Sequence, residues 1–350
     1  MDAPKFSLFA WAQLVRLPNV FTVWADVIMA FCITLCASIF HLTAWEYAFL
    51  GIFIFASTLC YWAGMILNDV HDFPEDSRRR AERPLVNGKI SLMTAKKMGY
   101  VMLLAGGFMF LAVTVLVRFL SNPDLLENHE HFFLQKWQNA GLTFFVILLF
   151  ILSILFYNTR LKNTWAGPFL MGACRALHLL VIFLILSWHG TLNITSADSP
   201  LWMIPAFSFI YITGLTFFAR NETEEEYQKN GLSQQILSVC ALTGGILILL
   251  RFVEKLKIFA PDSLISGVTQ NPWMWQILII YLAVFVGLRT FNALLNGSEK
   301  RIRRGVKQAI FTLFMVDAAL VFTVSGIFTA GFILLMIFPA TILGRFFYST

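Results

Sequence analysis

Three aspartates follow one another closely at the end of a long apolar run. Asp69, Asp72 and Asp76 are spaced i, i+3 and i+7, so helical geometry places them on one face. Charged groups at the edge of a hydrocarbon layer are costly, and they persist mostly where they bind something. Carboxylate oxygens gathered in this way suit Mg²⁺, which usually bridges protein carboxylates to substrate phosphates. We therefore predict a magnesium and phosphate site here; the alternative is a solvated helix end of mixed charge.

The residues that follow these aspartates are strongly basic. Arg78, Arg79, Arg80 and Arg83 come directly after the last aspartate. Guanidinium groups bind phosphate oxygens through charge-assisted, often paired hydrogen bonds. The sequence therefore predicts basic side chains that contact the phosphates themselves.

A second group of polar residues lies in or beside an apolar segment further along the chain. Arg175 and His178 are i, i+3 in that segment, so we expect them to face the same way. Ionisable residues inside membrane-length segments are functional candidates by default. Together with Tyr157 and Lys162, which come just before the segment, they predict a cationic pocket for an anion.

Further acidic residues occur in two other settings. Asp26 and Asp317 lie inside apolar segments, where they either pair with such cations or hold helices together. Arg220 opens a polar segment in which Glu222 and Glu226 are i, i+4 and predict a second acidic face. The alternative for this face is a solvated acidic run.

The composition is that of an integral membrane protein. Of the 350 residues, 58% are hydrophobic and only 13% are charged, with a mean hydropathy of +0.72, whereas soluble domains carry about 25% charged residues. We expect one all-α domain over residues 1–350, a polytopic bundle of nine to ten transmembrane helices. The apolar segments lie near 18–40, 46–67, 98–117, 139–157, 165–188, 201–219, 235–250, 274–295, 308–326 and 331–348.

Lys and Arg are divided unequally between the two sides of the membrane. With a cytoplasmic N-terminus, the segments on that side hold 19 of the 26 Lys and Arg, and the opposite side holds five. The positive-inside rule therefore predicts a cytoplasmic N-terminus and cytoplasmic polar segments. These segments are 68–97, 157–164, 220–234 and 296–307. Topology accounts for the net charge of +6, so no nucleic-acid partner is expected.

Two acidic faces with basic residues between them have one coherent chemical use. A diphosphate ester could be held through Mg²⁺ on both sides, and metal ions with Lys or Arg would stabilise the leaving diphosphate as the carbon–oxygen bond breaks. An apolar, water-poor chamber would protect the allylic cation so formed. The 36 Phe and 10 Trp supply ring faces that stabilise cations.

Several motifs of this sequence, and their order along the chain, resemble those of the UbiA superfamily of intramembrane prenyltransferases. The first signature of that family resembles Asn68-Asp69-x-x-Asp72-x-x-x-Asp76 followed by Arg83-Pro84-Leu85 and Gly88. Two shorter motifs are similar to the family's start and to its tyrosine–lysine loop: Arg16-Leu17-Pro18-Asn19, and Tyr157 with Leu161-Lys162. More narrowly, 171–178 and the tail that ends at Arg345 resemble the EboC-like bacterial branch.

The resemblance implies a helical bundle around a central cavity in the inner (cytoplasmic) membrane of a bacterium. It also implies Mg²⁺-dependent transfer of a prenyl group from a prenyl diphosphate to a lipid-soluble acceptor, aromatic or lipid. The implied metal ligands are Asn68, Asp69, Asp72 and Asp76, with Glu222 and Glu226 in place of a second motif. Taken together, the residues and the resemblance predict substrate contacts from Asn19, Arg83, Tyr157, Lys162, Arg175, His178 and Arg220, and they predict Asp69, Asp72, Lys162 and Arg175 as catalytic residues.

The sequence departs from the family pattern in two ways. The second motif is normally aspartate-rich, whereas only Glu222 and Glu226 stand in its place here. The family usually has nine spans, but ten apolar segments can be drawn. The degenerate second motif leaves open a protein of another class, a non-catalytic isoprenoid or lipid binder or transporter on the same fold. Release of diphosphate with Mg²⁺ separates the enzyme from this carrier.

Overall fold

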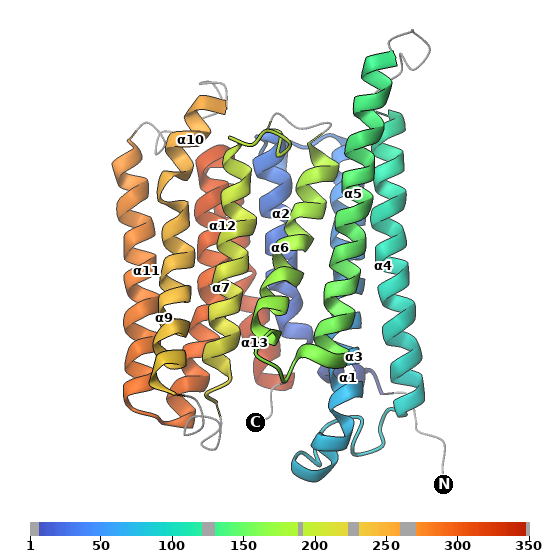
Figure 1. The fold of residues 1–350 in the computed structure, drawn as a ribbon, viewed down its shortest axis with the longest axis vertical. Coiled ribbons are helices and arrows are strands. Elements are labelled where there is room, and N and C mark those ends of the chain that lie inside the picture. Colours follow the sequence, from blue (N-terminus) through green and yellow to red (C-terminus); the bar gives the residue numbers. More distant parts are fainter. Residues whose placement is uncertain (1–6, 121–129, 188–191, 223–230, 260–270, 348–350) are drawn as a thin grey trace.

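The computed structural model of the chain is all-helical. It describes residues 7–120, 130–187, 192–222, 231–259 and 271–347, and no strand occurs within these ranges. The long helices run side by side as one bundle, as predicted (Figure 1). Their bounds are α1 Leu8–Leu14, α2 Val20–Leu35, α3 Ala44–Arg79, α4 Leu92–Leu120, α5 Glu130–Phe156, α6 Gly167–Leu186, α7 Met203–Ala219, α9 Leu232–Leu247, α10 Phe252–Phe259, α11 Pro272–Leu295, α12 Glu299–Leu335 and α13 Ile337–Phe347.

Local sequence signals set several of the helix starts. Thr43 caps α3, because its Oγ1 accepts from the Glu46 amide at 3.3 Å while Glu46 Oε2 accepts from the Thr43 amide at 2.7 Å. Pro168 and Pro272 lie in the first turns of α6 and α11, where the amide that proline lacks would have no partner inside the helix. Helix α3 continues to Arg79, well past its apolar part, so the acidic motif lies on this helix.

The described residues contain nine candidate membrane spans by length and composition, which makes the chain a multi-pass membrane protein. The ten apolar segments differ from this count at one place. The segments predicted near 308–326 and 331–348 fall within a single candidate span, Glu299–Phe347.

This last span is a hairpin. Gly326 interrupts it with φ 75° and ψ −174°, a backbone conformation that residues with a Cβ rarely adopt. Next to it, Ser325 Oγ donates to the Ala37 carbonyl at 2.7 Å, just beyond the end of α2. The second arm, which ends with α13, runs back along the whole length of α2. Its last residue shows this, because the ring of Phe347 lies 5.1 Å from the ring of Phe9, which precedes α2 in the chain. Both arms of the hairpin therefore correspond to predicted apolar segments.

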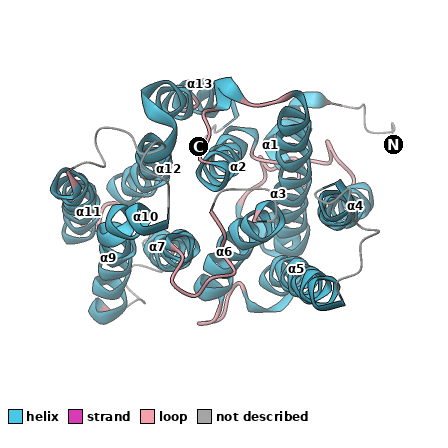
Figure 2. Cartoon of the chain, turned by 90° about the horizontal axis from the view of Figure 1, so that it is seen from above, coloured by secondary structure: helices cyan, strands magenta, loops and turns pink. Residues whose placement is uncertain are grey.

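Helix α2 lies at the middle of the bundle. It packs against α3, α6, α12 and α13, and Figure 2 shows these helices grouped around it. Close approach of α3 and α4 depends on Gly106, where a Cβ would lie 2.9 Å from the Ala56 carbonyl oxygen. The end of the bundle that carries α1, the last turns of α3 and the end of α13 holds the polar residues discussed next, and we call it the basal end (Figure 1).

A small hydrophobic cluster at the basal end fixes the loop after α3. Leu85 and Ile90 of this loop are buried together with Ile66 and Val70 of α3, and Leu14 of α1 completes the contact. Burying these side chains removes apolar surface from water and so favours the folded-back loop. The loop is therefore held against α3, which brings Arg83 to the acidic face of that helix.

Candidate functional site

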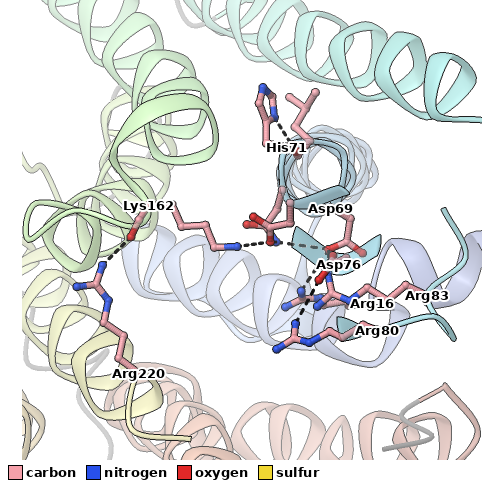
Figure 3. A network of polar contacts seen from close by, with 11 residues as sticks. Arg16, Asp69, His71, Asp76, Arg80, Arg83, Lys162 and Arg220 are labelled. Atoms are coloured by element: carbon pink, nitrogen blue, oxygen red, sulfur yellow. Dashed lines mark hydrogen bonds and ion pairs between the residues drawn. The ribbon is translucent and has the colours of Figure 1, made fainter. Parts of the chain in front are cut away.

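The acidic face of α3 is the centre of a network of ion pairs. Asp69, Asp72 and Asp76 lie on its last turns, as the i, i+3, i+7 spacing predicts. In Figure 3, Lys162 approaches this face from one side, and Arg16, Arg80 and Arg83 approach it from the other. Two of the three aspartates, Asp69 and Asp76, are buried, so their charges depend on these partners.

Arg83 connects two of the aspartates. Its Nη1 lies 3.1 Å from Asp69 Oδ1 and 2.5 Å from Asp76 Oδ2. Arg80, one helical turn after Asp76, approaches the same carboxylate at 3.7 Å. Arg80 and Arg83 therefore contact the carboxylates of the acidic motif, whereas the sequence predicted contacts from the basic residues to substrate phosphates.

Arg16 reaches Asp69 from the N-terminal part of the chain. Its Nη2 lies 3.4 Å from Asp69 Oδ1, and its backbone is left-handed, with φ 48° and ψ 54°. This conformation is uncommon for a residue with a Cβ and is often retained at functional sites. It turns the chain between α1 and the short helix Leu17–Asn19. The arginine of the Arg16-Leu17-Pro18-Asn19 motif is therefore part of the site, a role that sequence reasoning did not assign to it.

Lys162 forms the other side of the network. It follows the π-helix Tyr157–Leu161 at the end of α5, and its Nζ contacts Asp72 Oδ2 directly. Asn68 lies between the turns, because its Nδ2 donates to Asp69 Oδ1 at 3.4 Å and to Asp72 Oδ2 at 3.3 Å. Oxygens of two carboxylates are therefore gathered around one point on α3.

Arg220 supports the loop that carries Lys162. Its Nη2 donates to the carbonyl oxygens of Lys162 at 2.6 Å and Thr164 at 2.7 Å, and its guanidinium lies 5.8 Å from the ring centre of Phe217. Figure 3 shows the side chain turned toward the loop. Arg220 does not line the pocket described next, in contrast to the expected position beside a phosphate.

A cavity of about 1170 Å³ opens onto this network at the basal end. Seven of the predicted site residues line it: Asn19, Asp69, Asp72, Asp76, Arg83, Lys162 and Glu222. Glu222 lies in the turn just after α7, so one residue of the predicted second acidic face shares the cavity with α3. Glu226, the other residue of that face, lies outside the described residues. Asn68 and Tyr157 flank the site without lining the cavity.

The donor set fits Mg²⁺ bound together with a substrate. Within the described ranges, no three His, Cys, Asp or Glu side chains come together as a complete metal cage. Mg²⁺ rarely uses such cages, because it keeps several waters and binds through one or two carboxylates plus substrate phosphates. Asp69 and Asp72, whose oxygens converge on Asn68, supply two such carboxylates on the cavity wall.

Arg175 and His178 do not join this cavity, which differs from the predicted cationic pocket. Arg175 Nη2 lies 2.7 Å from Asp26 Oδ1. Asp317 is close enough to both residues to interact with their charges. His178 is buried deeper, where its Nε2 lies 2.8 Å from Ser57 Oγ. The ion pair matches the first of the two expectations for Asp26, that it pairs with one of these cations.

The cavity also has a wall that sequence reasoning missed. Helices α12 and α13 contribute Arg303, Lys307 and Arg345 together with apolar residues. These basic residues are visible in the sequence, where their positions indicate only the cytoplasmic side of the membrane. Their contribution to the site depends on the hairpin at Gly326, which returns α13 to the basal end.

Comparisons with known proteins agree with this fold. Residues 27–123 match the family model of the UbiA prenyltransferase family, a segment that contains the α3 aspartates and Arg83. No curated protein matches the chain.

Several solved structures have the same fold. A structure of digeranylgeranylglyceryl phosphate synthase aligns over 90% of this chain and 97% of its own, with 18% identity and a TM-score of 0.59. A UbiA homolog from Archaeoglobus fulgidus aligns over 93% of this chain and 99% of its own, with 12% identity and a TM-score of 0.56. The same homolog bound to GPP and Mg²⁺ aligns over 89% and 99%, with 13% identity and a TM-score of 0.54.

Fold and site together define a multi-pass, all-helical membrane protein with a charged cavity at one end of its bundle. The segment that holds the acidic motif matches the UbiA prenyltransferase family model, and the chain shares its fold with solved UbiA homologs, in agreement with the predicted resemblance.

Proposed function

We propose that this protein is an Mg²⁺-dependent prenyltransferase that moves a prenyl group from a prenyl diphosphate to a lipid-soluble acceptor within the membrane. One observation carries the proposal. Asp69 and Asp72 share a cavity wall with Arg83 and Lys162. All of these except Lys162 lie within the segment that matches the UbiA family model. The solved homolog structures with GPP and with DMAPP, each bound together with Mg²⁺, support the same donor class.

The residues of α3 would hold the donor through Mg²⁺. When bound, Mg²⁺ neutralises charge that develops on the leaving diphosphate. Asp69 and Asp72 would provide its protein ligands, and the hydrogen bonds from Asn68 Nδ2 would orient their oxygens. Arg83 contacts Asp69 and Lys162 contacts Asp72. Both basic side chains are therefore close enough to donate hydrogen bonds to a diphosphate bound next to these carboxylates. Their charges stabilise the diphosphate as it departs.

The transfer step is a substitution at the allylic carbon. The carbon–oxygen bond to diphosphate breaks, the acceptor supplies the electron pair for the new bond, and a proton leaves the acceptor. The cavity becomes apolar along α12, where Ile310, Phe311 and Phe314 line it. Such a wall keeps water away from the allylic cation, and its ring faces stabilise the positive charge.

A carrier on the same fold is the second candidate. It is favoured by one observation, that every α3 aspartate is engaged by a basic side chain and only Glu222 represents the second acidic face among the described cavity residues. Purified protein given radiolabelled geranyl diphosphate and Mg²⁺ separates the two. Release of diphosphate supports the enzyme, and binding without turnover supports the carrier.

The proposed location is the bacterial inner membrane with the basal end in the cytoplasm. The basal end carries Arg16, the basic loop after α3 and the basic start of α12, and an excess of Lys and Arg is typical of cytoplasmic segments. A water-soluble diphosphate would then enter the cavity from the cytoplasm, while its prenyl chain extends toward the bundle interior.

A further inference from the structure

The wall formed by α12 and α13 carries cationic charge that the acidic motif does not use. Arg16, Arg83 and Lys162 contact the α3 aspartates. Across the described residues, Lys307 and Arg345 have neither a carboxylate partner nor a hydrogen bond to another side chain, although both line the cavity. Lys307 Nζ lies 5.6 Å from the ring centre of Phe311, a contact that holds a cation without neutralising it.

Arg303 is the third basic residue of this wall, and it is partly committed. Its Nη2 lies 2.6 Å from Glu299 Oε1, one helical turn earlier. Both side chains are about half exposed, so this pair is weak and easily exchanged. The wall therefore presents two uncompensated cations and one that is loosely paired.

The same wall changes character with depth. Residues 303, 307, 311 and 314 are spaced i, i+4, i+8 and i+11, so they lie along one face of α12. At 1.5 Å per residue, Phe314 is roughly 10 Å deeper in the bundle than Lys307. The face therefore runs from cationic at the cavity mouth to aromatic and aliphatic further in, which matches a molecule with an anionic head and an apolar body.

We propose that this wall is the acceptor subsite, and that the acceptor carries a carboxylate or phosphate bound by Lys307 and Arg345. The proposal rests on the prenyltransferase function and adds the chemical class of the acceptor. The donor diphosphate is bound at α3, where metal ligands and its own cations are gathered. A second anion held by α12 and α13 would bring the acceptor's apolar part beside the allylic carbon.

The test measures binding of three anions to detergent-purified protein, and two of the anions are compared with an uncharged counterpart. The probes are oleoyl lysophosphatidic acid against monoolein, 4-hydroxybenzoate against phenol, and inorganic phosphate alone. The variant is Lys307→Ala/Arg345→Ala. The control is Arg301→Ala/Arg304→Ala, which removes the same charge from exposed positions outside the cavity lining.

We expect at least one anion to bind the wild type more tightly than its uncharged counterpart. That affinity should fall about tenfold or more in the cavity variant, which corresponds to about 1.4 kcal/mol, and should stay within about twofold in the control. Preference for the lysolipid identifies a lipid phosphate, preference for the benzoate identifies an aromatic acid, and preference for phosphate alone identifies a small phosphorylated acceptor. Equal loss in both variants, or no loss in either, would overturn the proposal.

Geranyl diphosphate distinguishes this inference from the proposed function. Its Mg²⁺-dependent binding should be within about twofold of wild type in the cavity variant, since the donor site is at α3. A large loss of donor binding would assign these cations to the donor and overturn the acceptor subsite. If the wild type releases no diphosphate yet binds an anion through Lys307 and Arg345, the prenyltransferase function fails while the anion site stands.

Discussion

Arg220 offers a sharp test of how the site is held together. Its guanidinium donates to the carbonyls of Lys162 and Thr164 at 2.6 and 2.7 Å, so it acts on the diphosphate through the position of Lys162. Hydrogen bonds from a charged donor contribute about 1.5–3 kcal/mol each. Because the contact with Thr164 is exposed, we take about 2 kcal/mol for the pair, after allowance for solvent. At 1.36 kcal/mol per factor of ten, Arg220→Ala should lower kcat/KM for the prenyl diphosphate about 30-fold.

The assay is a double-mutant cycle on diphosphate release. Lys162→Ala, Arg220→Ala and the double variant are compared with wild type, and Arg160→Ala removes an exposed charge near the same loop as a control. If Arg220 works through Lys162, the double variant should be no slower than Lys162→Ala alone, because residues that act as a unit are not additive. Full additivity of the two losses would refute this reasoning and assign Arg220 a direct contact with the diphosphate.

Two further predictions concern the second acidic face and the orientation. Glu222 lines the cavity, so Glu222→Gln should raise the Mg²⁺ concentration for half-maximal activity, whereas Glu224→Gln should match wild type; identical Mg²⁺ curves for both would reduce the face to a solvated loop. In a cysteine-free background, Cys placed at Ser77 or Ser298 should be blocked only by reagents that cross the membrane, and labelling from outside intact cells would contradict the cytoplasmic basal end.

The acidic face of α3 was predictable because its geometry is local. Once 44–79 is helical, i, i+3 and i+7 spacing alone brings Asp69, Asp72 and Asp76 to one side. The contacts from Arg83 were also foreseeable, since the residue follows in a short loop whose apolar Leu85 must return to the core. The membrane-spanning helices were also predictable from local sequence, because length and hydropathy are properties of each segment by itself.

The cavity wall opposite α3 was not predictable from sequence. Lys307 and Arg345 reach it only because the hairpin at Gly326 returns α13 to the basal end, and no local pattern encodes that contact. Arg175 and His178 illustrate a second limit. Residues at i, i+3 share a helix side, but they differ by nearly a turn in depth, and here neighbouring helices offer Asp26 to one and Ser57 to the other.

The central claim is that Asp69 and Asp72 bind the donor diphosphate through Mg²⁺, and one measurement tests it most directly. Diphosphate release from a radiolabelled prenyl diphosphate is followed for wild type, Asp69→Asn and Asp72→Asn, with Mg²⁺ and with EDTA. Asp198→Asn, an exposed aspartate away from the cavity, is the matched control. We predict Mg²⁺-dependent release by wild type and control, and less than about a tenth of it in each α3 variant, a barrier increase above ~1.4 kcal/mol. Release by correctly inserted Asp69→Asn and Asp72→Asn proteins at near wild-type rates would contradict the account.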